Sequence, residues 1–457
     1  MENSNNDSPS LGWKVKKEKN TYDCAIPQLS EDEEEFLRLL ANEFSEYSKN
    51  YDASTPSLAK KAVDTLFSQL LSREGIEVDD EQQKYLSNAA ISHLAGFAPL
   101  DAMLNDENIE EIAVIGIKKP IYVYLRKKGW QKTNASFTTH EHLIHIINKM
   151  ARSLGRRITS NSPRINALLP NNSRMHASIP PLSKGELTIR LHSSTPWSIA
   201  DILQTKSTTP QALSFLWLAF QSDSSILIAG NTSSGKTTLL NSLSSFIPLN
   251  ERILVIEETP EIRLPHPHLV QLTANEDLQI NMTNLVRDSL RMRPDRVIVG
   301  EIRTPPEVEA FAETLLSGHA RGSYATFHAQ SANEAIRRLQ NLGISQDDLS
   351  SLNFIVMQRR IARYDANKKK QKEIRKMLGI YMLSNLKLLP IFEFNPNNSQ
   401  LLPTPHLKSA LSLLSQKLGI QEKQIKKLFS SRTSFLSRLT PRHPDEITNK
   451  MQKFAYG

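Results

Sequence analysis

A segment near the middle of the chain fits the pattern G-x-x-x-x-G-K-[ST] at every defined position. Glycines let backbone N–H groups approach phosphates closely, the lysine supplies positive charge to the outer phosphates, and the hydroxyl can ligate Mg²⁺. An apolar run precedes the segment and a helix opens directly after it, so a helix N-terminus would face the anion. We therefore expect a nucleotide site at Gly230, Asn231, Thr232, Ser233, Ser234, Gly235, Lys236, Thr237 and Thr238.

Two further groups of charged residues follow apolar runs that read as buried strands. The run 296–299 leads through a glycine to Glu301, and a carboxylate at that strand end can hold the Mg²⁺ shell or orient water. Arg303 can reach the same phosphates or pair with a carboxylate. The run 253–256 is followed by an acidic turn, which taken alone is more often a solvated loop. One of its carboxylates is the candidate base that activates water, among Glu257, Glu258 and Glu261.

Two histidines, His319 and His328, flank another predicted strand. They can act as sensors that report whether the γ-phosphate is present. Taken alone, the pair is more often two ordinary, partly buried histidines. The candidate catalytic residues are therefore Glu258, Glu261, Glu301, His319 and His328, and the candidate metal ligands are Thr237 and Glu301. Glu257 and Arg303 are candidate nucleotide-binding residues.

The elements that must position these residues form an α/β protein of several domains. Continuous apolar runs such as 225–229 suit buried strands of a parallel sheet, and they alternate with helical segments. Amphipathic spacing ahead of them predicts about three helices and then a strand-rich region. We expect a polar, disordered tail at 1–28, a small helical bundle at 29–97, an α/β N-terminal domain at 98–200, a linker at 201–208, the P-loop domain at 209–395 and a C-terminal helical region at 396–457.

Composition limits the protein class. The chain has 457 residues, of which 39% are hydrophobic, and Cys24 is its single cysteine, so an intrachain disulfide is excluded. No stretch approaches the roughly 20 apolar residues that span a bilayer, and the polar N-terminus does not read as a signal peptide, so we expect a cytoplasmic protein. The net charge of +8 allows anionic partners, and Arg and Lys are dense in 359–376. We interpret that stretch as a solvated hairpin with a charged turn.

These motifs, in this order, resemble the secretion and type IV pilus assembly ATPases, including the archaeal pilus and archaellum motors. The resemblance covers about residues 100–394. Its segments read GNTSSGKTT, IEETPE, RMRPDRVIVGEIR and SGHARGSYATFHAQSANEAIRRL, with LDAMLNDENIEEIAVIGIKKPIYVY and SPRINALLPNNSRMHASIP before them. Two departures are visible. The acidic segment usually carries Glu-Asp, and here Glu258 replaces the Asp. The segment LPNNSR stands where LPDGSR is common.

The resemblance implies a hexamer whose subunits carry an N-terminal domain hinged to a RecA-like ATPase domain, with ATP bound between them. It assigns phosphate and Mg²⁺ binding to Lys236 and Thr237, the Walker B acid to Glu301, and coupling of nucleotide state to movement to His319 and His328. Arginines of the N-terminal domain and linker close onto the phosphates in this family. The matching stretches hold Arg164, Arg174 and Arg190.

Three functions remain open from the sequence. The first is a motor of a type II/type IV secretion or type IV pilus-like system, cytoplasmic and peripheral at the inner face of the cell membrane. It would act on an integral-membrane platform protein, and indirectly on pilin-like or secreted cargo. The second is a hexameric nucleic-acid translocase, which the basic stretch permits. Only Tyr364 there could stack on bases, so we expect no direct nucleic-acid contact. The third is a scaffold that binds nucleotide without turnover.

Overall fold

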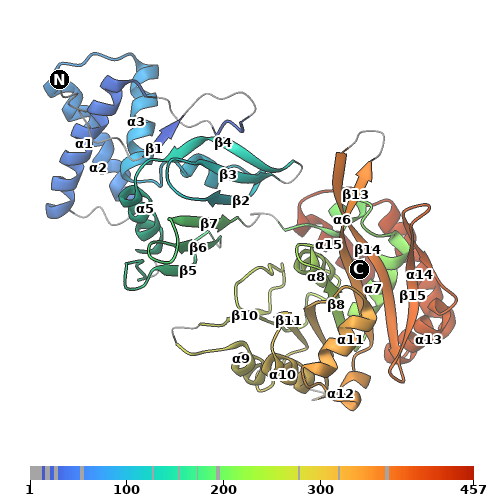
Figure 1. Cartoon of the computed structure of the whole chain (residues 1–457). Coiled ribbons are helices and arrows are strands. Elements are labelled where there is room, and N and C mark those ends of the chain that lie inside the picture. Colours follow the sequence, from blue (N-terminus) through green and yellow to red (C-terminus); the bar gives the residue numbers. More distant parts are fainter. Residues whose placement is uncertain are drawn as a thin grey trace. The chain divides into compact units, whose positions relative to one another are not determined.

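The computed structural model describes residues 13–15, 21–24, 29–51, 56–125, 128–152, 155–171, 173–191, 196–275, 278–316, 320–365 and 370–457. The chain divides into two compact units, Met1–Ser193 and Ser194–Gly457. Both are drawn in Figure 1, and each is described here by itself.

Unit 1 begins with three helices, as the amphipathic spacing predicts. Ser30 caps the first of them: its Oγ accepts the Glu33 N–H at 3.3 Å, and Glu33 accepts the Ser30 N–H at 2.8 Å. Four acidic residues fill that first turn, where they complement the helix dipole. The helices of the unit are α1 (Glu31–Asn50), α2 (Pro56–Glu74), α3 (Asp80–Leu94), α4 (Asp101–Leu104) and α5 (His140–Arg152).

Unit 1 continues into an antiparallel sheet with the order β1-β4-β3-β2-β7-β6-β5. Helices and sheet share one hydrophobic core, in which Phe36 and Phe67 of the helices join Ile112 and Phe137 of the strands. The predicted polar tail differs in part, because residues 13–15 form a strand that pairs with β4. The strands are β1 (Trp13–Val15), β2 (Ile109–Val114), β3 (Pro120–Leu125), β4 (Gly129–Phe137), β5 (Arg164–Leu168), β6 (Arg174–Ser178) and β7 (Glu186–Arg190).

Unit 2 is built on a sheet of order β10-β9-β11-β12-β8-β13-β14-β15-β16. Neighbouring strands from β10 to β13 pair in parallel, which confirms the predicted parallel core, and the last three strands extend it antiparallel. The strands are β8 (Ile226–Gly230), β9 (Ile253–Glu257), β10 (Leu269–Thr273), β11 (Arg296–Ile302), β12 (Gly322–His328), β13 (Phe354–Asp365), β14 (Lys370–Ser384), β15 (Lys387–Asn395) and β16 (Gln400–Pro403).

Helices cover both faces of this sheet. Along β8, Ile226 and Ile228 belong to one core cluster and Leu227 and Ala229 to another, as expected for a strand buried on both sides. The helices are α6 (Ile199–Gln204), α7 (Pro210–Gln221), α8 (Lys236–Ser244), α9 (Met282–Ser289), α10 (Pro305–Leu316), α11 (Ala332–Asn341), α12 (Gln346–Ser350), α13 (Leu407–Lys417), α14 (Glu422–Ser437) and α15 (Pro444–Tyr456).

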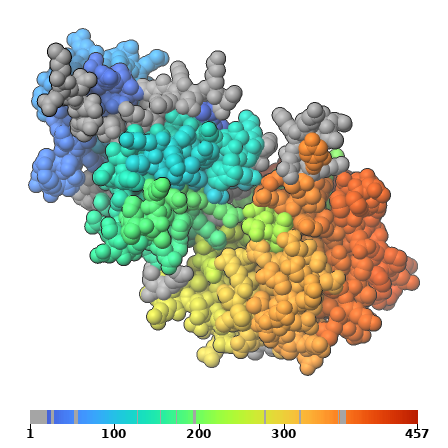
Figure 2. All heavy atoms as spheres, in the orientation of Figure 1, coloured from blue at the N-terminus to red at the C-terminus, as the bar shows by residue number. Residues whose placement is uncertain are grey.

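The C-terminal helices belong to unit 2. Leu414, Ile425 and Met451 lie in the same core cluster as β8 and α7. In Figure 2 the residues coloured orange-red lie directly beside those coloured orange on the surface of this unit. The division between the units precedes the predicted linker 201–208, whose first residues form α6. Within the described residues, no helix is both long and apolar enough to cross a membrane.

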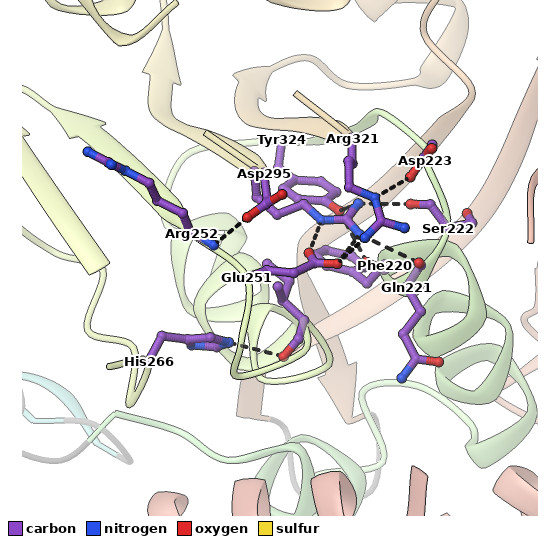
Figure 3. A network of polar contacts seen from close by, with 12 residues as sticks. Phe220, Gln221, Ser222, Asp223, Glu251, Arg252, His266, Asp295, Arg321 and Tyr324 are labelled. Carbon is purple, nitrogen blue, oxygen red and sulfur yellow. Dashed lines mark hydrogen bonds and ion pairs between the residues drawn. The ribbon is translucent and has the colours of Figure 1, made fainter. Parts of the chain in front are cut away.

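A buried ionic network anchors the start of β11 (Figure 3). Arg296 is fully buried, and its Nε donates to Glu251 Oε2 at 2.5 Å. Its Nη1 donates to the Ser222 carbonyl at 2.8 Å and to the Tyr324 hydroxyl at 3.1 Å. Arg321 adds a contact of 2.9 Å to Glu251 Oε1. Because β11 runs parallel to β8 through β12, this network lies at the opposite edge of the sheet from the P-loop.

Candidate nucleotide site

The P-loop connects the end of β8 to the start of α8. Ser233 and Gly235 adopt left-handed φ angles of 58° and 88°, a conformation that costs glycine little. Gly235 is the N-cap residue of α8 and makes no side-chain cap hydrogen bond. The first amides of a helix lack partners within the helix, so those of α8 are available to an anion. The loop therefore has the backbone of a phosphate cradle.

Three predicted residues from three elements meet beside this loop. Lys236 is only 7% exposed, and its Nζ lies 3.3 Å from His328 Nε2 and 3.4 Å from the Asn231 carbonyl. His328 ends β12 and pairs in register with Gly230 of β8. Its Nε2 lies 2.7 Å from Glu301 Oε1, at the end of the neighbouring strand β11. Parallel strands thus bring a cation, a histidine and a carboxylate to one edge of the sheet.

The environment of His328 favours its neutral form. Partial burial and the nearby charge of Lys236 lower the pKa of the ring, while Glu301 acts in the opposite direction. A histidine whose pKa is lowered is predominantly neutral at pH 7. A neutral ring can lie close to a lysine ammonium and still contact the carboxylate.

Arg303 joins two of the predicted carboxylates. Its Nη2 donates to Glu301 Oε2 at 2.5 Å and its Nη1 donates to Glu258 Oε2 at 2.6 Å. Partial burial opposes the charge of Arg303, but the hydrogen bond to Glu301 and the nearby carboxylates raise its pKa overall. The Glu258 side chain is 46% exposed and that of Glu301 23%. Glu258 therefore stands at the solvent side of the cluster.

Glu257 has a different place from the other acidic residues. It is buried, and its Oε1 accepts the backbone N–H groups of Glu261 at 3.1 Å and Ile262 at 3.2 Å. A Cβ on Gly300 would approach Glu257 Cγ to 2.9 Å, so the absence of a side chain there makes room for this carboxylate. The sequence predicts that Glu257 contacts the nucleotide. In the structure its carboxylate accepts backbone N–H groups of the acidic turn, and its contact with nucleotide stays a prediction.

The remaining predicted site residues lie elsewhere. His319 is outside the described residues. Arg164, Arg174 and Arg190 belong to unit 1, at the starts of β5 and β6 and the end of β7, and Arg174 pairs in register with Arg190. Their contact with nucleotide stays a prediction.

Sequence reasoning missed three residues of the β13–β14 hairpin that touch the P-loop. Gln358 Nε2 donates to the Ser234 carbonyl at 3.2 Å, and Arg375 Nε donates to the Ser233 carbonyl at 3.1 Å. The backbone of Arg360 binds the Asn231 side chain. The hairpin itself was expected as a solvated element. Its base, which we define as Gln358, Arg360 and Arg375, instead contacts the P-loop. Only the strand order, which places β13 beside β8, reveals these contacts.

The residues present fit Mg²⁺ and a nucleoside triphosphate. Mg²⁺ in such sites is held by one or two protein oxygens together with phosphate oxygens and water. Thr237 in the first turn of α8 and Glu301 at the end of β11 are suitable donors. Lys236 supplies a nearly buried positive charge beside the loop.

The sequence matches the model of the family described as "Type II/IV secretion system protein" over residues 93–389. The chain belongs to this family. The match covers the α/β part of unit 1 and most of the unit 2 sheet, including the whole P-loop cluster. The fold is therefore that of the family: an α/β protein with a RecA-like P-loop core preceded by an N-terminal α/β domain.

Relatives of this family member include secretion proteins of bacteria. It is 34% identical over 260 residues to the type IV secretion system protein PtlH of Bordetella pertussis, covering 50% of this chain and 76% of that protein. An uncharacterized protein of Methanocaldococcus jannaschii is 36% identical over 233 residues, covering 48% of this chain. The crystal structure of the VirB11 ATPase of Brucella suis is 27% identical, covers 63% of this chain and 94% of that one, and gives a TM-score of 0.32.

Some relatives are longer than the shared region. The match spans 32% of the first Methanocaldococcus jannaschii protein and 57% of a second one. The activity, substrate and partners of the whole protein are therefore proposals.

Proposed function

We propose that the chain is the ATP-hydrolysing motor of a type II/type IV secretion or type IV pilus-like assembly system, coupling hydrolysis to domain motion. The observation that carries this proposal is the cluster of Lys236, His328 and Glu301, which links α8 to the ends of two adjacent strands. Each of these residues suits a step of phosphoryl transfer to water. Membership of the type II/IV secretion system protein family supports a role in secretion or in assembly of a related filament.

The side chains divide the chemistry as follows. Lys236 binds the outer phosphates, and to do so its ammonium moves from His328 towards the anion. Thr237 and Glu301 would hold Mg²⁺, which neutralises charge on the phosphate oxygens when bound. His328 contacts both Lys236 and Glu301, so it responds when either one moves.

The residues that activate the attacking water belong to the acidic turn 257–261. Glu257 accepts buried backbone N–H groups, so its carboxylate is committed to holding the turn. Glu258 and Glu261 are then the candidates for the base that orients the attacking water. Arg303 holds Glu258 and Glu301 together and would have to release a carboxylate that takes part in the reaction.

The partners and location are part of the same proposal. We expect a homo-hexamer, peripheral at the cytoplasmic face of the cell membrane, that acts on an integral-membrane platform protein and through it on pilin-like or secreted cargo. ATP and Mg²⁺ are its substrate and cofactor, and no direct nucleic-acid partner is expected. Support comes from the family match and from the type IV secretion proteins among the relatives.

The proposal is tested by nucleotide binding and ATP turnover of the purified chain with Mg²⁺. Lys236→Ala should abolish both, because it removes the nearly buried charge of the P-loop. Lys387→Ala is the matched control, since this exposed lysine of β15 lies in the antiparallel extension and should leave both unchanged. Binding without turnover in the wild-type chain, under every condition, would support a scaffold instead.

A further inference from the structure

The P-loop is held from the outside by the base of the β13–β14 hairpin. The Asn231 side chain makes two hydrogen bonds to the backbone of Arg360: its Oδ1 accepts the N–H at 2.9 Å and its Nδ2 donates to the carbonyl at 3.1 Å. The Asn231 side chain thereby continues the hydrogen bonding between β8 and β13 beyond the last backbone pair, Gly230 with Gln358. The first variable residue of the loop is thereby fixed to β13.

Two peptide groups further along the loop are held by side chains. Arg375 Nε donates to the Ser233 carbonyl at 3.1 Å, and Gln358 Nε2 donates to the Ser234 carbonyl at 3.2 Å. In a trans peptide the carbonyl and the following N–H point in opposite directions. Fixing the Ser234 carbonyl on the hairpin side therefore directs the Gly235 N–H to the other side.

The β13–β14 hairpin also packs closely against the backbone of the P-loop. A Cβ on Gly230 would lie 1.9 Å from the Gln358 carbonyl oxygen, so β13 touches the backbone of the loop directly. Arg375 Cδ lies 3.7 Å from the place that a Cβ on Gly235 would occupy. The Arg375 side chain thus runs along the loop from Ser233 to Gly235, both of which have left-handed φ angles.

We propose that the base of the β13–β14 hairpin sets the nucleotide-binding geometry of the P-loop, with Asn231 and Arg375 as positioning residues. The inference rests on the proposed function, because it concerns the same site. A left-handed φ angle at Ser233, which is not a glycine, is a conformation that a free loop leaves readily, and contacts from a rigid sheet keep it populated. Loss of a contact would lower the fraction of chains with a competent loop and so weaken binding.

The hairpin offers a matched control for charge. Arg360 and Arg375 are partners across the two strands, and Arg359 pairs with Lys376 at the next position. Successive side chains of a strand point to opposite faces, so Arg359 carries the same charge as Arg375 on the other face of the hairpin. A general attraction of basic residues for ATP would involve both arginines, whereas positioning of the loop involves only Arg375.

The experiment measures the dissociation constant of a fluorescent ADP and the KM and kcat of ATP hydrolysis for four chains: wild type, Arg375→Ala, Arg359→Ala and Asn231→Ala. Arg375→Ala should weaken binding about fivefold and raise KM more than it lowers kcat, as expected for the loss of one solvent-exposed hydrogen bond. Arg359→Ala should stay near wild type. Asn231→Ala removes both hydrogen bonds to the Arg360 backbone without changing the charge of the loop, so it should also weaken binding.

The outcomes separate the inference from the proposed function. Equal weakening by Arg375→Ala and Arg359→Ala would overturn the inference in favour of general electrostatic attraction. Wild-type affinity in both Arg375→Ala and Asn231→Ala would overturn it as well. A wild-type chain that binds no nucleotide would overturn the proposed function and this inference with it. Arg375 is exposed, so its removal is not expected to unfold unit 2, and thermal unfolding of each variant checks this.

Discussion

Glu257 shows how a carboxylate within a motif can bind the backbone of its own turn. Its carboxylate is buried at the end of β9 and accepts the N–H groups of Glu261 and Ile262. These bonds hold the acidic turn in place beside Gly300. The neighbouring Glu258, by contrast, is half exposed and reaches Arg303.

We predict that Glu257→Ala lowers the free energy of unfolding by about 1–3 kcal/mol, because it leaves two amides of the turn without their acceptor. Glu257→Gln keeps one acceptor oxygen and should cost less. Glu258→Gln, at an exposed position, should change stability by no more than about 0.5 kcal/mol. Chemical denaturation checks all three. A Glu257→Ala chain of wild-type stability that has lost nucleotide binding would show instead that Glu257 contacts the ligand.

Residue patterns predicted those parts of the candidate site that are marked by a short, continuous stretch of sequence. The P-loop and the carboxylate at the end of β11 were found because an apolar strand followed by a specific residue type is a local signal. Gln358 and Arg375 could not be found this way. They are more than 120 residues from the loop they touch, and a single sequence does not state that β13 lies beside β8.

At the scale of elements, the boundary at 201–208 illustrates a different limit. Turn-forming residues suggested a linker there, but Ser198 and Thr209 are helix caps. Ser198 and Asp201 form a capping box for α6, and Thr209 caps α7 with a proline in its first turn. Caps and linkers use the same polar residues, so composition alone does not distinguish them.

The start of β11 depends on the ion pair of Arg296 and Glu251. Both side chains are almost fully buried, whereas the Arg321 side chain, which also contacts Glu251, is 51% exposed. The hydrogen bonds to the Ser222 carbonyl and the Tyr324 hydroxyl satisfy the remaining guanidinium donors of Arg296 in part. The network therefore ties β11 to the end of α7 and to β12.

We predict that Arg296→Ala destabilises unit 2 by about 3 kcal/mol or more, because it leaves the buried Glu251 with only an exposed partner. Arg321→Ala removes a largely solvated contact and should cost less than about 1 kcal/mol. Denaturant unfolding measures both changes. It is followed by tryptophan fluorescence, to which Trp217 in the unit 2 core contributes. Equal losses in the two variants would contradict this view of the network.

At the scale of the whole molecule, the chain joins a strand-rich unit to a P-loop unit. The predicted helical bundle shares one core with the α/β sheet of unit 1, and the C-terminal helices share one with the sheet of unit 2. The spacing of apolar residues predicted these helices but not which sheet each one packs against. Helical spacing identifies the apolar face of a helix, but it does not identify the element that this face contacts.

We propose that this chain is a ring-forming ATPase whose Walker B carboxylate is Glu301. The most direct test is ATP turnover per chain over a concentration series, with the mass in solution followed in parallel, for wild type and Glu301→Gln. We predict that wild-type turnover rises as hexamers form and that Glu301→Gln assembles but does not turn over. Wild-type turnover at one rate in monomers and hexamers alike, or undiminished turnover in Glu301→Gln, would contradict the claim.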